Sequence, residues 1–273
     1  MSRIKKVIAI FGMPRSGTSF LGQIFDSSPQ VAYRLEPIFS YKLKNMVNDK
    51  STKEDFLAFF EKAFDSHDDD FMNQTEKRKK GHYPVFQKTK EDVLVFKTTR
   101  FHNLLPNLME LFDEDFLQVI SLVRHPAGAI SSWVTHPNEF PSNFDYKEEW
   151  RSGSCRKSSV EEFWGFEDWK DVTSQHLNLE NKYRNFHIFQ YEDIVNNITD
   201  ETKKIFDFSK IPYTRQTEDF LIKSQDKHID DPYAVYKDKS VTLKWKKNLD
   251  KYIQKQIIDE TKQSQLKRFL VEK

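Results

Sequence analysis

A short glycine-containing loop near the start of the chain limits the possible folds more than any other feature. Residues 7–11 form an unbroken apolar run, which is typical of a central strand in a parallel sheet. Gly12 and Gly17 follow at once, although the chain has only 7 glycines among 273 residues. Apolar residues then recur at helical spacing, at Leu21, Ile24 and Phe25. A strand, a glycine loop and a helix in this order favour a bound anion, because backbone N–H groups and the positive end of the helix dipole meet there.

Alternating strand and helix patterns continue along the chain. Four more apolar runs predict strands, at residues 31–35, 93–96, 116–123 and 186–191. Helical patterns separate them, and a capping box of Ser159 and Glu162 predicts the start of a long helix that reaches about Leu179. No internal repeat or linker interrupts the pattern. We therefore expect one α/β domain over residues 1–273, with a parallel sheet of about five strands flanked by helices.

The composition excludes some classes of protein. A formal net charge of +1 gives no basic excess of the kind that general nucleic-acid binders carry. Cys155 is the single cysteine, so no intrachain disulfide is possible, and a reducing, cytoplasmic compartment is expected. The N-terminal apolar run is too short for a signal peptide, and no stretch approaches the length of a membrane span.

The spacing of the two loop glycines nearly matches the ATP-binding loop of P-loop NTPases, which predicts a P-loop-NTPase-like sheet. That loop requires a lysine directly after its second glycine, and Thr18 stands there instead. The cation of this loop is Arg15, two residues before Gly17. This departure counts against an ATPase or a kinase, although a P-loop nucleotide kinase or NTPase stays an alternative.

The loop resembles that of a different family. The segment Pro14-Arg15-Ser16-Gly17-Thr18-Ser19 is similar to the 5′-phosphosulfate loop of the sulfotransferases that use 3′-phosphoadenosine 5′-phosphosulfate (PAPS). The resemblance implies that Arg15, Ser16, Gly17, Thr18 and Ser19 bind the donor. It also gives Phe20 the position of an aromatic ring that stacks on the adenine.

A second motif supports the resemblance. In the same superfamily, an arginine at the end of a strand and a serine eight residues later bind the 3′-phosphate of PAPS, and Arg124 and Ser132 have this spacing. Strand ends are where α/β sheets bind ligands, and a guanidinium offers a fork of donors to phosphate. Weaker matches place Tyr191 near the adenine and Lys239 and Ser240 near the 3′-phosphate. In that last segment Asp238 replaces a basic residue and Ser240 replaces a glycine.

Two segments bear on the identity of the general base. Lys97-Thr98-Thr99 is similar to the Lys-Thr-His segment of phenol and steroid sulfotransferases, but their catalytic histidine is Thr99 here. Leu35-Glu36-Pro37 resembles the Glu-Pro segment of carbohydrate and bacterial sulfotransferases, which points to Glu36 as the base if burial raises its pKa. Arg15 and Lys97 are the cations expected at the leaving phosphate, and His102 and His125 are further candidates for the base.

Two polar spans are expected to shape the acceptor site. Residues 40–92 and 135–160 do not follow the strand–helix alternation and are interpreted as insertions on the acceptor side. They contain aromatic and acidic residues that suit a sugar or a cationic substrate, such as Tyr41, Glu148, Glu149 and Trp150.

Taken together, the motifs imply sulfuryl transfer from PAPS to a hydroxyl of a small molecule or carbohydrate, with Glu36 as base and PAP, the desulfated donor, as product. No metal, nucleic-acid partner or membrane span is expected, and the sequence does not indicate an oligomeric state. Two further functions fit the same motifs: sulfation of an amine, and a non-catalytic module that binds PAPS or PAP.

Overall fold

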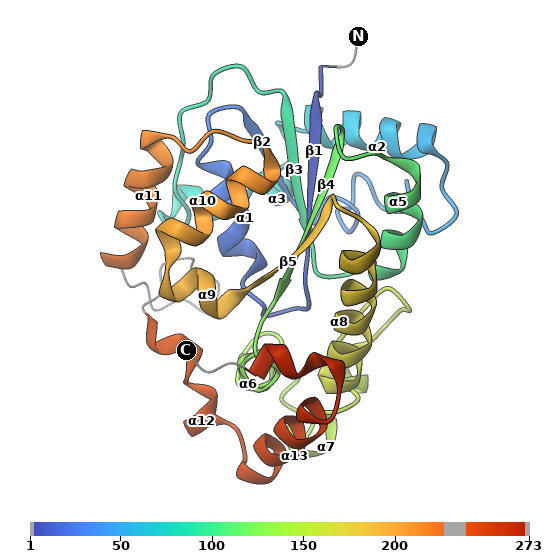
Figure 1. The fold of residues 1–273 in the computed structure, drawn as a ribbon, viewed down its shortest axis with the longest axis vertical. Coiled ribbons are helices and arrows are strands. Elements are labelled where there is room, and N and C mark those ends of the chain that lie inside the picture. Colours follow the sequence, from blue (N-terminus) through green and yellow to red (C-terminus); the bar gives the residue numbers. More distant parts are fainter. Residues whose placement is uncertain (1–2, 227–238, 271–273) are drawn as a thin grey trace.

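A parallel five-stranded sheet forms the centre of the molecule (Figure 1). The computed structural model describes residues 3–226 and 239–270. Every neighbouring pair of strands is parallel, and their order is β2-β3-β1-β4-β5. The strands are β1 (Lys6–Phe11), β2 (Val31–Leu35), β3 (Val93–Thr98), β4 (Leu117–Val123) and β5 (Phe186–Gln190). This parallel sheet confirms the predicted fold class, and its mostly apolar strands are what a sheet covered on both faces requires.

Helices cover both faces of the sheet (Figure 1). One face carries α1 (Thr18–Asp26), α9 (Tyr191–Asn196), α10 (Ile198–Ser209) and α11 (Arg215–Asp226), and the other carries α2 (Lys53–Asp65), α5 (Leu105–Leu111) and α8 (Gly165–Lys182). Beyond the carboxyl ends of the strands lie α6 (Pro126–Val134), α12 (Trp245–Asn248) and α13 (Lys251–Lys262). The shorter elements are α3 (Asp70–Asn73), α4 (Thr75–Lys79), α7 (Tyr146–Glu149), η1 (His102–Leu104), η2 (Ser154–Arg156), η3 (Lys239–Thr242) and η4 (Gln265–Leu270). None of the helices in the described ranges is long and apolar enough to cross a membrane.

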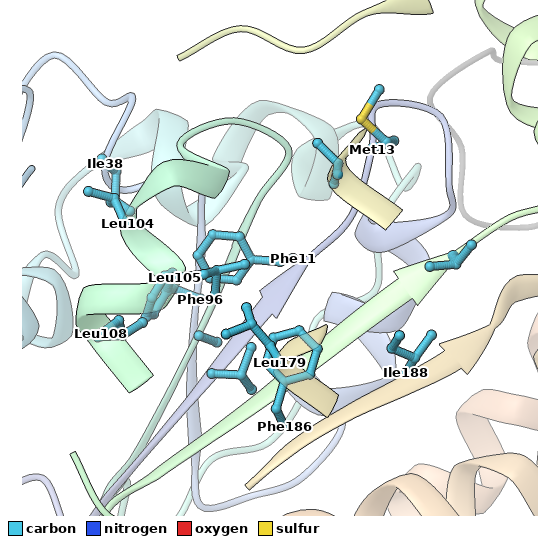
Figure 2. Close-up of a cluster of buried hydrophobic side chains, with 14 of the residues drawn as sticks. Phe11, Met13, Ile38, Phe96, Leu104, Leu105, Leu108, Leu179, Phe186 and Ile188 are labelled. Carbon is cyan, nitrogen blue, oxygen red and sulfur yellow. The ribbon is translucent and has the colours of Figure 1, made fainter. Parts of the chain in front are cut away.

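The alternation of side chains along each strand divides the core in two. Val7, Ala9 and Phe11 of β1 face the α2/α5/α8 side, whereas Ile8 and Ile10 face the α1/α10 side. On the first side Phe11 meets Phe96 of β3 edge-to-face, with ring centroids 6.5 Å apart, beside Leu105 and Leu108 of α5 (Figure 2). This packing fixes the ends of β1 and β3, from which the functional loops leave the sheet.

The predicted capping box is wrong. Helix α8 begins at Gly165, not at Ser159, and the Trp164 backbone N–H donates to the Asp168 carboxylate at 2.8 Å in its first turn. Glu162 instead accepts hydrogen bonds from the backbone N–H and the hydroxyl of Ser158, at 2.8 and 2.7 Å. Its carboxylate is therefore fixed in the loop before α8, where it faces Arg100.

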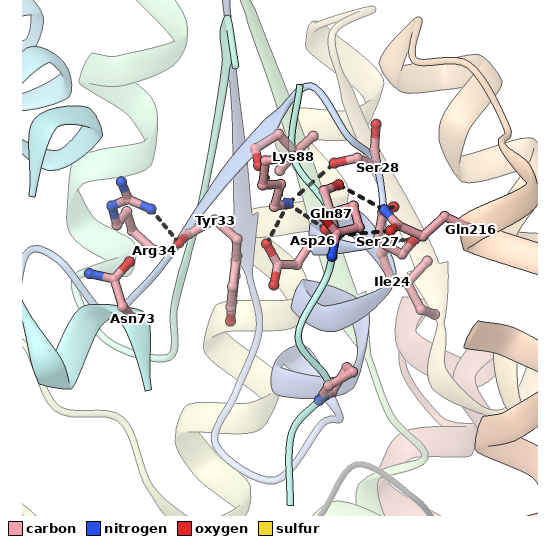
Figure 3. A network of polar contacts seen from close by, with 12 residues as sticks. Ile24, Asp26, Ser27, Ser28, Tyr33, Arg34, Asn73, Gln87, Lys88 and Gln216 are labelled. Carbon is pink, nitrogen blue, oxygen red and sulfur yellow. Dashed lines mark hydrogen bonds and ion pairs between the residues drawn. The ribbon is translucent and has the colours of Figure 1, made fainter. Parts of the chain in front are cut away.

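The buried carboxylate of Asp26 forms ion pairs with the 40–92 span and so holds this span against α1 (Figure 3). Asp26, at the end of α1, has a side chain that is only 6% exposed and forms ion pairs of 2.8 Å with Lys88 and with Arg78. The Lys88 ammonium also donates to the backbone carbonyl of Val31 at 2.8 Å. The loop that contains Lys88 and the helix α4 that contains Arg78 are thus held against α1 by one charge.

Replacement of Asp26 is expected to destabilise the fold. Asp26→Asn leaves two partly buried cations without their counter-charge, which should lower the free energy of unfolding by about 2 kcal/mol. Urea unfolding monitored by circular dichroism measures this change. Asp65→Asn is the matched control, since Asp65 pairs with Arg3 but is 66% exposed, and its effect should stay below about 0.5 kcal/mol. Equal effects of the two substitutions would contradict the structural role of Asp26.

Candidate functional site

One large cleft lies where the strands end. It has a volume of about 660 Å³, and it is lined by a residue from the carboxyl end of every strand. These residues are Glu36 after β2, Lys97 near the end of β3, Arg15 after β1, Arg124 after β4 and Tyr191 after β5. The carboxyl edge of a parallel sheet is the usual ligand site of α/β proteins. The structure therefore gathers the main predicted site residues in one place.

The glycine loop presents the first turn of α1 to this cleft. Gly17 precedes the helix with a φ of 91°, and no side chain caps the first turn. A Cβ at Gly17 would lie 2.4 Å from the Tyr191 ring, so only glycine fits there. Arg15 also adopts a left-handed conformation, with a φ of 69°. Such strained residues are concentrated at functional sites, because the surrounding fold must hold them in place.

Glu36 is held by a set of donors from the end of β3. Its side chain is 6% exposed, and its carboxylate accepts from the Lys97 ammonium at 2.9 Å. It also accepts from the Thr98 hydroxyl at 2.9 Å, the Thr99 hydroxyl at 2.8 Å and the Thr99 backbone N–H at 3.0 Å. The residue has a φ of 45°, and its own N–H donates to the Lys97 carbonyl at 2.8 Å. The carboxylate is therefore preorganised at the floor of the cleft.

The balance of forces on Glu36 differs from the expectation that burial raises its pKa. Burial alone would raise the pKa, but the charges of Lys97 and Arg100 and the hydrogen bonds from Lys97 and Thr99 act in the opposite direction. The net result is a pKa below the ordinary value of 4.5. Glu36 is therefore ionised at neutral pH, which is the form that accepts a proton.

Arg15 and Arg124, the two arginines predicted to bind the donor, are linked by hydrogen bonds: Arg124 contacts the backbone of Arg15, and Arg15 contacts Ser132 in α6. Arg124 donates from Nη1 to the Arg15 carbonyl at 2.9 Å and from Nη2 to the Val241 carbonyl at 3.2 Å, and it lies 4.8 Å above the Tyr191 ring. Arg15 in turn donates from Nε to the Ser132 hydroxyl at 3.4 Å. Arg15, Arg124 and Ser132 thus form one cluster, and the Arg15–Ser132 contact was not apparent from the sequence because the two residues lie far apart in the chain.

The remaining loop residues divide between the cleft and the core. Thr18, Ser19 and Phe20 line the cleft, and the Phe20 ring lies 6.4 Å from that of Phe220. Ser16 is fully buried and does not line it; its hydroxyl has no hydrogen-bond partner among the described residues. A direct side-chain contact of Ser16 with a ligand is therefore not supported by the geometry.

The C-terminal segment is described only in part. The turn η3 runs from Lys239 to Thr242, and the bond from Arg124 to Val241 brings its backbone to the cleft. Asp238 and the side chains of Lys239 and Ser240 lie outside the described part of the structure. Their contact with the 3′-phosphate stays a prediction.

Neither candidate histidine lines the cleft. His102 is 1% exposed, and its Nδ1 lies 3.2 Å from Nε2 of the equally buried His176. Burial lowers the pKa of His102 to about 3, so its imidazole is neutral. The His125 ring stacks on Trp245 at a centroid distance of 4.7 Å. Of the three candidates for the base, only Glu36 therefore lines the cleft.

The two insertions both contribute to the cleft, but through other residues than expected. The 40–92 span supplies Phe71, Gln74, Lys77 and Tyr83, and the 135–160 span supplies Thr135, His136, Pro137 and Glu139. None of the four residues singled out from the sequence lines the cleft: Tyr41 is fully exposed, Trp150 is buried in the core, and Glu148 and Glu149 belong to the short helix α7. Phe39, Arg100 and Trp164 do line it, and no sequence motif pointed to them.

A metal site is not apparent in the described ranges. No group of three or more histidine, cysteine, aspartate or glutamate side chains in residues 3–226 and 239–270 is arranged to hold a metal ion.

Comparisons with known proteins agree with this architecture. The family described as "Sulfotransferase domain" matches residues 5–270. No curated protein matches the chain. Among solved structures, a mouse sulfotransferase, SULT7A1, complexed with PAP has a TM-score of 0.58 at 14% identity, with 97% of this chain and 88% of that chain covered.

Two further structures are similar over most of their length. The sulfotransferase domain from the curacin biosynthetic pathway has a TM-score of 0.53 at 17% identity and covers 95% of this chain and 98% of its own. Retinol dehydratase in a complex with retinol and PAP has a TM-score of 0.55 at 11% identity, with 95% and 81% covered. At these identities the structures show the fold alone, whereas the family match extends over nearly the whole sequence. The chain belongs to the sulfotransferase family.

Proposed function

We propose that this protein transfers a sulfuryl group from PAPS to a hydroxyl group of a small molecule or carbohydrate, with Glu36 as the general base. The observation that carries the proposal is the buried, ionised Glu36 carboxylate, which lies in the same cleft as the glycine loop and the Arg15–Arg124 cluster. PAP is bound in the mouse sulfotransferase and in retinol dehydratase, and this supports the same donor for the shared fold.

The donor occupies the β1/β4/β5 end of the cleft in this proposal. The open first turn of α1 and the Arg15 guanidinium bind the 5′-phosphosulfate, because N–H groups and a cation face the same space. Arg124 and Ser132 bind the 3′-phosphate, and Lys239 and Ser240 contribute from η3. Phe20 and Tyr191 contact the adenine from the two sides of the loop.

The transfer step needs a base and fixed positive charge. The acceptor oxygen forms a bond to sulfur while the bond between sulfur and the 5′-phosphate oxygen breaks, and PAP leaves. Glu36 takes the proton of the acceptor hydroxyl, and Arg15 and Lys97 stabilise the charge that develops on the leaving phosphate.

Lys97 connects the general base with the leaving phosphate. Its ammonium lies 2.9 Å from the Glu36 carboxylate and lines the cleft beside the loop. A donor phosphate that attracts this ammonium weakens its hold on Glu36, which raises the pKa of Glu36 toward the value that a base requires. The acceptor proton then has a better destination when the donor is bound.

Ligand-induced stabilisation tests the donor assignment. At a concentration about 100-fold above its Kd, PAP should raise the melting temperature by about 5 °C or more, since a bound ligand stabilises only the folded state. The same concentration of 5′-AMP or of ATP with Mg²⁺ should raise it much less. A larger shift with ATP and Mg²⁺ than with PAP would favour a nucleotide kinase or NTPase and would contradict the proposal.

A second measurement tests whether the protein catalyses sulfuryl transfer. Protein is incubated with ³⁵S-labelled PAPS and a panel of alcohols, sugars, phenols and amines, and mass spectrometry identifies the sulfated atom. Transfer to a hydroxyl supports the proposal, whereas transfer to nitrogen alone would assign N-sulfation. Stabilisation by PAP with no transfer to any acceptor would instead support a binding module without catalysis.

A further inference from the structure

Arg100 brings a guanidinium to the acceptor end of the cleft, where no donor-binding role is assigned to it. It follows β3 and lines the cleft beside Glu36, with Nη1 4.0 Å from the Glu36 carboxylate. Its guanidinium lies 4.1 Å above the Phe39 ring, and its Nε is 3.4 Å from the Glu162 carboxylate. The side chain is 16% exposed, so it is largely desolvated and fixed in orientation.

Neither neighbouring carboxylate depends on Arg100 for its hydrogen bonds. Glu36 already accepts four hydrogen bonds from β3 and the residue after it, and Glu162 accepts two from Ser158. Within the described part of the chain, Nη1 and Nη2 of Arg100 donate no hydrogen bond. Two parallel N–H donors of one guanidinium are therefore available to a bound molecule, and this fork matches a carboxylate, phosphate or sulfonate.

The backbone holds Arg100 in this position. Its N–H donates to the Thr98 hydroxyl at 3.1 Å, and that hydroxyl is itself held by its hydrogen bond to the Glu36 carboxylate at 2.9 Å. The next residue, Phe101, has a φ of 60° and donates its N–H to the Glu161 carbonyl at 3.0 Å. Binding to Arg100 therefore requires little ordering of the protein.

The positive charge in the cleft is not confined to the residues assigned to the donor. Among the described residues that line the cleft, six are basic and two are acidic; the basic ones are Arg15, Lys77, Lys97, Arg100, Arg124 and Lys244, and the acidic ones are Glu36 and Glu139. Arg15 and Arg124 follow β1 and β4, whereas Arg100 follows β3 at the side of β2. Arg100 thus places a positive charge beside the β2 end of the cleft, away from Arg15 and Arg124.

Aromatic side chains form the wall beside Arg100. Phe39 and Phe71 both line the cleft and are 40% and 44% exposed, so two large apolar rings are open to a bound molecule there. A bound acceptor with an apolar portion would cover these rings. The chemistry of this end of the cleft is therefore one oxyanion site next to an apolar surface.

We propose that the acceptor carries an anionic oxygen group next to an apolar ring or chain, and that Arg100 binds this group while Phe39 and Phe71 contact the apolar part. The inference rests on the proposed function, because it treats this end of the cleft as the acceptor site. Arg100 thereby selects acidic acceptors and sets the direction from which the hydroxyl approaches Glu36.

The test uses PAP-saturated protein and probes that cannot react. Calorimetric titration compares phenylacetate, benzylphosphonate and phenylmethanesulfonate with the neutral phenylacetamide. At least one anionic probe should bind about 10-fold or more tightly than phenylacetamide, as expected for a charge-assisted hydrogen bond in a partly desolvated site. The three anions distinguish carboxylate, phosphate and sulfonate chemistry.

Substitutions assign the preference to Arg100. Arg100→Gln should abolish the preference for anionic over neutral probes and leave the PAP affinity unchanged, and Arg100→Lys should retain part of the preference. Arg156→Gln is the matched control, because Arg156 pairs with Glu139 at 3.3 Å but does not line the cleft; it should leave the preference intact.

Failure of the inference is distinct from failure of the proposed function. Absence of PAP binding contradicts the function itself. Normal PAP binding with no preference for any anion overturns the role of Arg100, as does a preference that survives Arg100→Gln, which would place the anion in the sulfuryl position near Arg15. If Arg100→Gln also weakens PAP binding, Arg100→Lys decides between the two explanations. Because it keeps the charge, it must keep part of the preference for anionic over neutral probes.

Discussion

Glu36→Gln is expected to reduce the turnover number for sulfuryl transfer by about 10² to 10⁴-fold, the usual contribution of a general base. The amide preserves the size of the side chain, and its one oxygen still accepts from Thr99, but its NH2 group cannot accept from Thr98 and the side chain cannot take a proton. Rapid-quench measurement with labelled PAPS and a saturating acceptor gives the rate of the chemical step. The affinity for PAP, measured by calorimetry, should change by less than about threefold.

A buried carboxylate elsewhere provides the control for this substitution. Glu192 is 5% exposed and accepts from the His125 backbone N–H at 3.1 Å, but it does not line the cleft. Glu192→Gln should therefore affect stability more than turnover. If Glu36→Gln retains wild-type turnover, another group is the base; if both substitutions reduce turnover alike, the effect is structural.

The pH dependence of kcat/KM for PAPS, which reports the protein before the donor binds, gives a second signature of the same residue. Glu36 acts as a base only when ionised, and its pKa in the free protein lies below 4.5. As the pH falls, activity should therefore persist to below 4.5 before Glu36 is protonated and the rate declines, and Glu36→Gln should remove this decline. A histidine base with an ordinary pKa would place the decline near pH 6.5 instead.

The sheet was predictable because its sequence signal is local. Each of the five strands is built on a mostly apolar run, which is unbroken in β1, and the structure places all five within a few residues of the predicted bounds. The largest shifts occur at the carboxyl ends: β3 extends to Thr98, and β5 stops at Gln190 because Tyr191 begins α9. These ends carry polar residues that serve the cleft, so apolar periodicity cannot define them.

The cleft was predictable only where a motif spans few residues. The glycine loop and the Arg124–Ser132 spacing are short patterns with a known chemical meaning. The hydrogen bonds to Glu36 come from residues more than 60 positions away, and the contact of Arg100 with Glu162 is equally distant in sequence. The direction of the Glu36 pKa shift depends on these contacts, which is why the expectation from burial alone had the wrong sign.

Arg124→Ala is expected to remove most of the preference for PAP over 5′-AMP, two ligands that differ only in the 3′-phosphate. In the wild-type protein this preference should be about 100-fold, the value of a charge-assisted contact to phosphate in a partly buried site. In Arg124→Ala it should fall to within about 10-fold, as measured by calorimetric Kd values for both ligands. The affinity for 5′-AMP should change far less, because its phosphate meets the loop rather than Arg124.

The ratio of the affinities for PAP and 5′-AMP distinguishes a direct contact of Arg124 with the 3′-phosphate from a role of Arg124 in supporting the loops. Arg124 also donates to the Arg15 and Val241 carbonyls, so its loss can loosen the glycine loop and η3. Loosening of this kind would weaken PAP and 5′-AMP alike and leave their ratio unchanged, which would contradict a 3′-phosphate role. Ser132→Ala should reduce the ratio less than Arg124→Ala, since a neutral hydroxyl contributes less than a guanidinium. If Arg124 and Ser132 contact one phosphate, the effects of Arg124→Ala and Ser132→Ala should combine non-additively.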